Sequence, residues 1–427
     1  MSLWKIAWRS IQQRALASTL TAISMALGVA LVVTVLVIHQ VIDQSFRRSA
    51  QGYNLIVGAK GGRLELVLNT VYHLGRPIEN IPYKVFLEFS EGRYKPAVEV
   101  AIPVCMGDSY EGFPVIGTVP EMFAKLHYLE GQDYEFAAGH NFNAANEFDA
   151  VIGSQVARKA GLAVGGTFRP SHGLIEKGEH GHPHRPFTIA GVLAPTGTPM
   201  DRALFVNMEG FYHLEGHGRP ASGGMPTLAP TESETHDHDA PIPEAQKRVT
   251  AILVCTKGDW QATSLAKQVN EEEPTAQAVM PAQEISGLLD GIVGNIQVLL
   301  LVLAILVVVV AGIGILVSIY NSMNDRRHEI AVMRALGARR STVVLVILLE
   351  SILLSLGGGL LGLLLGHGLI GLLKPLIEDE TGVIVHAMAF QWVELILIPG
   401  LIGLATIVGY LPAVVAYRTD VAKSLNG

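Results

Sequence analysis

Four long apolar segments dominate the pattern of this chain, and each is long enough to cross a bilayer. Charged residues are absent from 15–42, 291–324 and 395–417, and Glu350 is the single charge in 341–373. A helix needs about 20 apolar residues to span roughly 30 Å of hydrocarbon. The sequence therefore predicts a membrane protein with four transmembrane α-helices over these ranges.

Residues 1–14, ahead of the first apolar segment, form an amphipathic pattern. Trp4, Trp8 and Ile11 recur at helical spacing, whereas Lys5 and Arg9 face elsewhere. Indole rings favour the headgroup level, so we expect a helix that lies on the cytoplasmic leaflet. The apolar run that follows exceeds the roughly 7–15 residues of a signal-peptide core, which favours a retained anchor.

The region between the first two apolar segments, 43–290, has the pattern of a mixed α/β domain. Short β-rich runs predict strands at 53–57, 98–104, 113–117, 150–152, 187–192, 203–206 and 248–254. Helix-like segments lie between them at 62–73, 120–126 and 154–160, the last followed by Gly161 as a C-cap. The stretch 213–243 is rich in Gly, Pro, Ser, Thr and acids and predicts a flexible surface loop.

The second apolar segment is longer than a bilayer requires. Residues 291–324 would extend about 51 Å as a helix at roughly 1.5 Å per residue. We expect this helix to continue beyond the bilayer as a stalk. A helix broken at Gly312 and Gly314 is the alternative.

The third and fourth apolar segments are rich in small residues, which let helix backbones approach closely in lipid. We expect helix packing, rather than a substrate path, at Gly357, Gly358, Gly362, Gly366 and Gly403. Intramembrane ionisable residues are rare and commonly functional. For Glu350 we favour a structural contact near the cytoplasmic end over a proton relay.

Composition and charge narrow the class of protein. The chain has 427 residues, of which 49% are hydrophobic and 16% charged, with a mean hydropathy of +0.37. Soluble domains carry about 25% charged residues, so a soluble enzyme, a disordered protein and a nucleic-acid binder are all disfavoured.

The distribution of charge predicts the orientation in the membrane. Residues 1–14, 325–340 and 418–427 hold ten basic and three acidic residues, whereas 43–290 holds 20 basic and 30 acidic residues. Because basic residues mark the cytoplasmic side, we expect both termini inside, the 43–290 domain outside, and 374–394 as a short outer loop.

Cys105 and Cys255 both fall in the outer domain, each within an apolar, strand-like run. An oxidising compartment would permit a disulfide between them. Two buried free thiols are the alternative.

Histidines gather in two places within the outer domain. Eight of the fifteen lie between residues 172 and 238, in loops at 172–184 and 213–243. Alternating H-x-H spacing suits flexible capture of zinc, because imidazole favours such cations. The candidate ligands are His172, His180, His182, His184, His236 and His238. Accumulation of histidine in a low-complexity loop is the alternative.

The segment 318–351, SIYNSMNDRRHEIAVMRALGARRSTVVLVILLES, resembles a loop of the MacB-type, FtsX-like ABC permeases. The pattern of that family is R-x-x-E-I-x-x-x-R-x-x-G-A followed by a basic pair. It is matched here by Arg326, Glu329, Ile330, Arg334, Gly337, Ala338, Arg339 and Arg340. The first helix, the outer-domain runs VIGTVPEMF and FTIAGVLAPTGTPMDRALFV, and the tail GYLPAVVAYRTDVAKSL are also similar, although Val414 and Val415 replace the usual Arg-Arg pair.

This resemblance implies a permease powered by a separate ABC ATPase, which would bind ATP and Mg. The printed sequence contains no G-x-x-x-x-G-K-[ST] phosphate loop. Helix 325–340 would dock on the ATPase through Ile330, Met333 and Leu336, oriented by Glu329 and Arg334 and followed by Gly337, Ala338 and Arg339. Two permease chains, as a homodimer, and two ATPases would form a mechanotransmission (type VII) unit in the bacterial inner membrane.

Three functions remain open from the sequence. The first is export or extraction of a lipid, lipoprotein, peptide or small compound, helped by a periplasmic adaptor or lipoprotein. The second is regulation of a periplasmic hydrolase without transport, as in the cell-division members of the family. The third is zinc sensing or delivery. An enzyme is disfavoured because no nucleophile or paired carboxylates stand out.

Overall fold

The structure is a computed structural model that describes residues 3–49, 52–129, 131–172, 186–214, 242–325, 338–381 and 392–418. The chain divides into two compact units. The first, called here the helical unit, comprises 1–42, 291–377 and 385–427. The second, called here the head, comprises 43–290 and 378–384.

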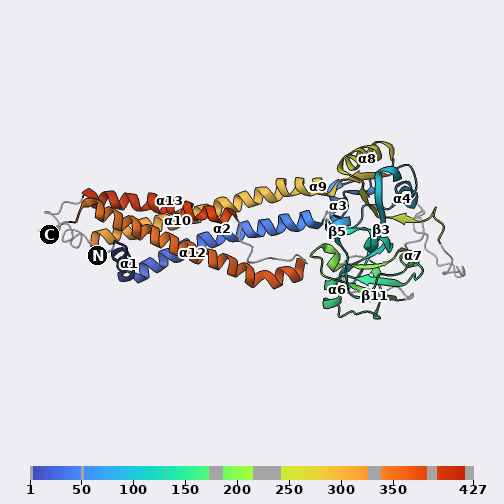
Figure 1. The fold of residues 1–427 in the computed structure, drawn as a ribbon, viewed down its shortest axis with the longest axis horizontal. Coiled ribbons are helices and arrows are strands. Elements are labelled where there is room, and N and C mark those ends of the chain that lie inside the picture. Colours follow the sequence, from blue (N-terminus) through green and yellow to red (C-terminus); the bar gives the residue numbers. More distant parts are fainter. Residues whose placement is uncertain are drawn as a thin grey trace, which may run out of the picture. The chain divides into compact units, whose positions relative to one another are not determined.

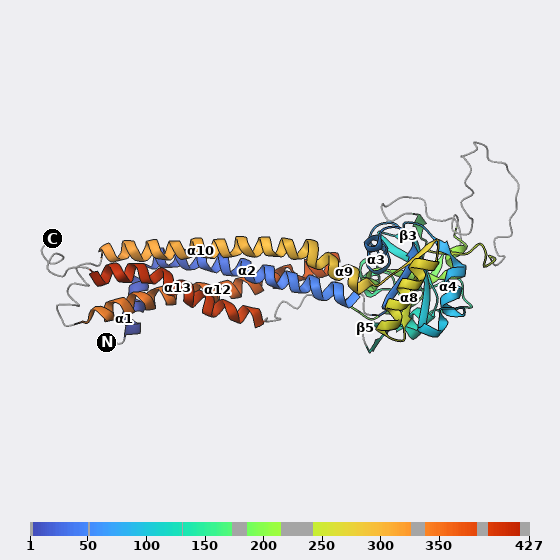
Figure 2. The same cartoon turned by 90° about the horizontal axis from the view of Figure 1, so that it is seen from above.

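The helical unit consists of the short amphipathic helix α1 (Leu3–Gln13) and of the long apolar helices α2 (Ala15–Ser49), α10 (Gly294–Asp325), α12 (Arg340–Thr381) and α13 (Trp392–Arg418), which lie alongside one another (Figures 1 and 2). Within the described residues, four runs are long and apolar enough to cross a membrane: Ala15–Asp43, Pro281–Asn321, Arg340–Glu378 and Glu394–Val414. The four transmembrane helices predicted from hydropathy are therefore confirmed.

Two of these helices differ from their expected bounds. The loop expected at 374–394 begins later, because α12 continues past Lys374 and Pro375 to Thr381. A proline removes one backbone hydrogen bond, which a membrane helix tolerates when its neighbours compensate. The second apolar helix is unbroken at Gly312 and Gly314. Its irregularity is instead a π-helical turn, Leu289–Val293, that joins α9 (Pro281–Leu288) to α10.

The head contains a mixed sheet of eleven strands in the described residues, in the order β15-β1-β14-β3-β4-β12-β8-β11-β7 with β10 on β3 and β9 on β11. The strands are β1 (Leu55–Ala59), β3 (Val98–Tyr110), β4 (Phe113–Thr118), β7 (Phe136–Gly139), β8 (Asp149–Ile152), β9 (Thr167–Phe168), β10 (Ser171–His172), β11 (Phe187–Leu193), β12 (Leu204–Asn207), β14 (Ala251–Thr256) and β15 (Ala276–Val279). Two small sheets pair β13 (Arg248–Val249) with β2 (Ile81–Pro82) and β5 (His127–Leu129) with β6 (Gln132–Asp133). A mixed α/β domain after the first helix was predicted, and the sheet confirms it.

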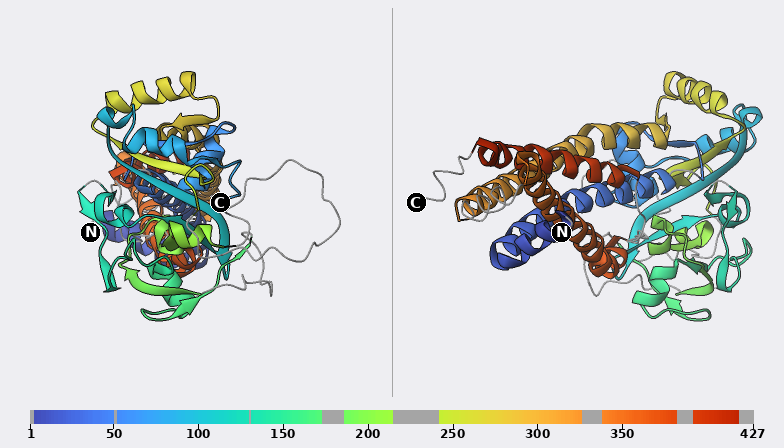
Figure 3. Two further views of the ribbon diagram at one scale, coloured as in Figure 1. Left: turned by 90° about the vertical axis from the view of Figure 1, so that its right-hand side faces the viewer. Right: turned by 60° about the vertical axis from the view of Figure 1, so that its left-hand side comes forward.

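Strand β3 joins the two halves of the sheet (Figure 3). Its first part pairs with β14, with Ala101 opposite Val254, and its second part pairs with β4, with Cys105 opposite Gly117. The register shifts between Met106 and Asp108, as at a β-bulge. Most pairs are antiparallel, but β12 runs parallel to β4 and β11 runs parallel to β8.

Short helices accompany this sheet. They are α3 (Arg63–Tyr72), α4 (Tyr83–Ser90), α5 (Glu121–Lys125), α6 (Ser154–Lys159), α7 (Met208–Tyr212) and α8 (Asp259–Glu272), with 3-10 turns at Lys95–Ala97 and Pro199–Arg202. Helix α6 ends at Lys159, one residue before the expected bound, and its C-cap is Ala160 rather than Gly161. Gly161 follows with a φ of +65°, which favours glycine. One apolar cluster forms the core of the head, and Phe89, Phe187 and Phe211 are among its buried members. The loop expected at 213–243 lies outside the described residues except at its ends.

Candidate functional site

Three glycines of α12 lie in close contact with α2. Gly358, Gly362 and Gly366 recur every four residues and therefore share one face of α12. A Cβ built on Gly362 would lie 2.6 Å from the carbonyl oxygen of Ala26 and 2.7 Å from the Cβ of Val29. The absence of a side chain thus lets the two backbones approach closely, which is the packing expected of small residues in lipid.

Two of the glycines expected to pack do not. Among the described residues, nothing lies within 4 Å of the Cβ position of either Gly357 or Gly403. Gly357 precedes Gly358 by about 100° of helical rotation, so it faces away from the shared stripe. On α13 the close approach is made instead at Gly409, whose Cβ would clash with the hydroxyl of Ser351.

Two buried serines connect α12 to α13. The single hydroxyl proton of Ser351 faces two acceptors, the carbonyl of Leu348 in its own helix at 2.9 Å and the carbonyl of Ala405 in α13 at 3.0 Å. The hydroxyl of Ser355 donates to the carbonyl of Leu401 at 3.2 Å. The serines lie one turn apart, and so do their acceptors, so the two bonds run in parallel along one interface. Hydroxyl-to-carbonyl bonds of this kind hold helices together where water is absent.

Helix α1 contacts α12 through the carboxylate that the sequence singled out. The buried hydroxyl of Ser10 donates to Oε2 of Glu350 at 2.8 Å. Ala7 is buried on the same face, whereas Trp4 and Trp8 are exposed, as an amphipathic helix requires. The contact fits the structural interpretation of Glu350. The leaflet on which α1 lies stays a prediction.

A second carboxylate in the helical unit pairs with a histidine that sequence analysis passed over. Nε2 of His367 on α12 lies 3.0 Å from Oε2 of Glu394 on α13, and Glu394 is completely buried. Glu394 was expected in a loop, so it was not weighed as a membrane residue. A histidine inside the third apolar segment and an acid directly before the fourth are the sequence features that could have predicted the pair.

Most of the residues expected to contact an ATPase lie outside the described residues. These are Glu329, Ile330, Met333, Arg334, Leu336 and Gly337. Ala338 and Arg339 are described and come directly before α12, and the carbonyl of Arg339 accepts a hydrogen bond from the backbone N–H of Thr342 at 2.9 Å. The expected coupling helix at 325–340 therefore stays a prediction.

The expected zinc ligands are likewise mostly outside the described residues. His180, His182, His184, His236 and His238 fall there. The backbone of His172 pairs with Asp108 where β10 joins β3. In the part of the chain that the structure describes, no three side chains of His, Cys, Asp or Glu come close enough to share a metal ion.

The disulfide considered between Cys105 and Cys255 is wrong, because both cysteines are free. Cys255 on β14 lies opposite Val100 of β3. Cys105 is five positions further along β3, about 16 Å away at 3.3 Å per residue, whereas a disulfide needs Cα atoms within about 7 Å. The Cys105 thiol instead lies 3.5 Å from the hydroxyl of Tyr212, and burial raises its pKa to about 12. A thiol with so high a pKa is inert at neutral pH.

Two family models match the chain. The model of the MacB-like periplasmic core domain matches residues 18–272, and the model of the FtsX-like permease C-terminal region matches residues 301–421. The chain belongs to the MacB-like and FtsX-like family of ABC transporter permeases. The first match spans most of α2 and the head as far as α8, and the second spans α12 and α13. The glycine stripe, the serine contacts and the His367–Glu394 pair therefore fall within matched regions, whereas Ser10 lies outside them.

Individual relatives agree with this family. The macrolide export ATP-binding/permease protein MacB of Syntrophobacter fumaroxidans is 28% identical over 209 residues, covering 47% of this chain and 28% of the relative. An uncharacterized ABC transporter permease of Methanocaldococcus jannaschii is 24% identical, covering 56% of this chain and 55% of the relative. MacB of Escherichia coli is 34% identical, and the match covers 30% of this chain and 19% of the relative. This chain thus spans about half, or less, of the length of the relatives it matches.

The family and the four candidate membrane helices together describe a multi-pass permease of the inner membrane. The family matches indicate no catalytic enzyme class for this chain.

Proposed function

We propose that this chain is the permease subunit of a mechanotransmission ABC transporter. A separate ATPase would bind at 325–340, two permease chains would pair, and both termini would lie in the cytoplasm. ATP-driven motion would reach the head and serve the export or extraction of a lipid, lipoprotein, peptide or small compound. Membership of the family supports an ABC permease in general, and the helices at both ends of the head support the transmission of motion.

The main support for the proposal is that the chain is helical both where it enters the head and where it leaves the head. Helix α2 continues from Ala15 past Ile42, the end of the helical unit, to Ser49 without a break. On the return, Pro281–Asn321 is helical throughout, including the π turn. A helical connection passes on a displacement, whereas a flexible Gly/Ser linker absorbs it.

The polar groups of the helical unit support the same conclusion. In the described residues, the hydroxyls of Ser351 and Ser355 bond backbone carbonyls, Ser10 bonds Glu350, and His367 pairs with Glu394. A hydrophilic substrate path needs polar groups turned toward a water-filled cavity. These groups instead bond neighbouring helices, which suits helices that move the head rather than conduct cargo. On α2, Thr34 Oγ1 and His39 Nδ1 are buried without a hydrogen-bond partner among the described residues.

Substitution of the coupling residues tests the ATPase interaction. E329A/R334A should abolish co-purification of the ATPase while membrane insertion and folding of the permease persist, because paired charges orient a docked helix. R93A/E272A is a matched control, since it also removes one basic and one acidic residue, at an ion pair of 2.9 Å in the head. Retained ATPase binding by E329A/R334A would overturn the docking assignment.

An insertion in the π turn tests the transmission of motion. Four residues of Gly and Ser inserted after Gly291 should keep ATPase binding but remove the ATP- and vanadate-dependent change in hydrogen exchange of the head. Four alanines at the same point preserve helical structure and serve as the control. An unchanged response with the Gly/Ser insertion would contradict transmission through this helix.

We also propose, from the eight histidines between residues 172 and 238, that the head binds zinc weakly. Titration of the full chain with zinc near neutral pH should show binding. It should be lost when His180, His182, His184, His236 and His238 are all replaced by Ala. Absence of binding by the unaltered chain would end the zinc proposal without affecting the permease assignment.

A further inference from the structure

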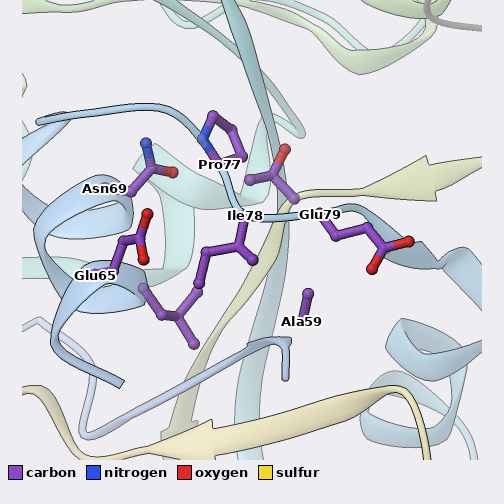
Figure 4. A pocket seen from close by; sticks show the side chains of 8 residues that line it. Ala59, Glu65, Asn69, Pro77, Ile78 and Glu79 are labelled. Atoms are coloured by element: carbon purple, nitrogen blue, oxygen red, sulfur yellow. The ribbon is translucent and has the colours of Figure 1, made fainter. Parts of the chain in front are cut away.

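The cavity beside α3 in the head is too small for an organic ligand. Asn69, Pro77 and Ile78 are among the residues around it (Figure 4), and the space between them has room for about one water molecule. One water there would satisfy the buried Oδ1 of Asn69, which has no hydrogen-bond partner among the described residues. The surface of α1 makes a stronger case for a ligand.

Helix α1 is attached directly to a membrane helix. It ends at Gln13, and the apolar span within α2 begins at Ala15. The backbone N–H of Arg14 donates to the carbonyl of Ile11 at 3.2 Å, and that of Ser18 donates to the carbonyl of Arg14 at 2.9 Å, so hydrogen bonds bridge the turn between the two helices. In Figure 1, α1 turns away from the line of α2 close to the N-terminus. Because lipid headgroups lie just beyond the hydrocarbon core, this attachment holds α1 at their level.

Three successive residues show how α1 is rotated about its axis. Ala7 is completely buried in the helical unit, whereas Trp8 and Arg9 are exposed. Each residue of a helix is turned by about 100° from the one before it, so these three lie on different sides of α1. Ser10 is 2% exposed and lies on the side of Ala7, where it bonds Glu350. This contact with α12 fixes which side of α1 faces protein and therefore which two sides do not.

The side of α1 that contains Trp8 is apolar and exposed. Trp4 lies one turn before Trp8 on this side, and the two residues are 54% and 50% exposed. Two indoles in contact with water would forgo the free energy gained by burying apolar surface. Tryptophan is instead enriched where a helix meets the headgroups of a bilayer. This side of α1 therefore fits the boundary between headgroups and acyl chains.

The side of α1 that contains Arg9 is basic. Lys5 lies one turn before Arg9 and Gln12 lies one turn after it, and all three side chains are exposed. The sequence of α1 includes no acidic residue, so nothing on the helix offsets the two positive charges. A helix in a membrane interface turns its apolar side to the acyl chains and its basic side to the headgroups. The tryptophan side and the basic side of α1 are neighbours, as this arrangement requires.

We propose that α1 binds anionic phospholipid headgroups through Lys5 and Arg9, with Trp4 and Trp8 at the boundary with the acyl chains. Guanidinium and ammonium groups donate charge-assisted hydrogen bonds to phosphate oxygens. Each basic residue close to an anionic bilayer contributes about fivefold in affinity. A lipid fits better than a protein partner because α1 is held at the level of the headgroups. The proposal goes beyond the function proposed above and does not depend on an ATPase or on the cargo.

Quenching of tryptophan fluorescence by brominated lipids tests the proposal at α1 itself. The full chain has four tryptophans, and W260F/W392F leaves Trp4 and Trp8 as the reporters. The two replaced residues are 77% and 85% exposed, so the fold should persist. This variant is placed in vesicles of phosphatidylcholine and phosphatidylglycerol, with the anionic lipid at about a fifth of the total and each lipid brominated in turn. Phosphatidylglycerol should be enriched about tenfold next to the two tryptophans, relative to its share of the bilayer.

Substitution of the two basic residues in the same background tests their part in this enrichment. K5Q/R9Q should reduce it to about twofold or less, while quenching by brominated phosphatidylcholine persists because the tryptophans remain in place. R76Q/K267Q is the matched control, since it also removes one arginine and one lysine, both exposed in the head, and it should leave the enrichment unchanged. Salt at about 1 M should lower the enrichment for the unsubstituted α1, because the Debye length falls to about 3 Å.

Three results would overturn the proposal. Equal quenching by the two lipids, corrected for their shares of the bilayer, would show that Lys5 and Arg9 do not select an anionic headgroup. Equal losses of enrichment in K5Q/R9Q and R76Q/K267Q would show only attraction by the net charge of the chain. No quenching by either lipid would mean that protein covers the two tryptophans, either a second copy of this chain or the ATPase.

Discussion

The head and the helical unit are held together by different means. In the head, large side chains fill the core: Phe123 makes edge-to-face contacts with Phe205 and Tyr134, with ring centroids 5.1 and 5.3 Å apart. In the helical unit the closest contacts involve residues without a side chain, such as Gly362, while large ones such as Leu364 are 72% exposed. Apolar burial stabilises the head because water surrounds it, whereas lipid is as apolar as leucine and offers helices no such gain.

The charged contacts of the head and of the helical unit also differ, in how far they are buried. Arg93 of the head forms ion pairs with Glu272 and Glu273 at the surface, where the pairs are screened and of small value. In the helical unit, His367 and Glu394 form one pair with a completely buried carboxylate. The buried His367–Glu394 pair should therefore count for more than the exposed ion pairs of Arg93.

The largest effect is expected from the head core. Phe205→Ala should lower the local free energy of unfolding of the head by about 3–5 kcal/mol, because a completely buried ring is replaced by a cavity. Hydrogen exchange of the full chain, followed by mass spectrometry, measures this for peptides of β4 and β12. Leu364→Ala, on the exposed side of α12, should change protection of its own helix by less than about 0.5 kcal/mol. Equal costs at the two sites would break the comparison.

The next largest effect is expected from overpacking the glycine stripe. Gly362→Val should destabilise the helical unit by about 1–3 kcal/mol, because the new side chain must displace the backbone at Ala26 and the side chain of Val29. Titration with SDS in mixed micelles measures the loss. Gly357→Val makes the same chemical change on the same helix where nothing lies within 4 Å, and should be near neutral. A comparable loss in both variants would mean that helix propensity, not close packing, governs this site.

Hydropathy predicted the membrane helices well because bilayer thickness imposes a minimum length on each of them. The expected strands of the head also lie close to those observed, as β12 at Leu204–Asn207 shows, because its buried strands are continuous apolar runs. Helix α8 was missed although Ala262, Leu265, Ala266 and Val269 recur at helical spacing on its buried side. Strand β15 has the sequence AQAV, which gives little β signal.

The contacts between helices could not be predicted in the same way. Ser10 and Glu350 are 340 positions apart, and His367 and Glu394 are 27 apart. Their pairing depends on the rotation of each helix about its axis, which composition does not specify. The same rotation separates Gly358, which packs, from Gly357, which does not. Sequence therefore identified the packing glycines and Glu350 as candidate contacts, while the structure was needed to add the serines and the His367–Glu394 pair and to say which residues meet.

A double-mutant cycle measures how strongly the buried partners His367 and Glu394 interact. H367A, E394A and the double variant, compared by SDS titration, should give a coupling energy of about 1–2 kcal/mol, because either single change removes one partner of a buried pair. The cycle between H367A and E350A is the control. Those residues lie about 25 Å apart along α12 and should be additive. Additivity in the first cycle would mean that the histidine and the carboxylate act separately.

The smallest effect is expected from the serines. Ser351→Ala and Ser355→Ala should each cost about 0.6 kcal/mol, the average for hydrogen bonds between membrane helices, because their acceptors already bond within α13. Thr406→Ala removes a hydroxyl that bonds the carbonyl of Ile402 within its own helix at 2.7 Å, so it should leave helix association unchanged. SDS titration at matched protein concentration separates the two outcomes. A loss at Thr406 as large as at Ser351 would place the stabilisation inside α13 rather than between α12 and α13, and the glycine stripe would then be the chief attachment of α12.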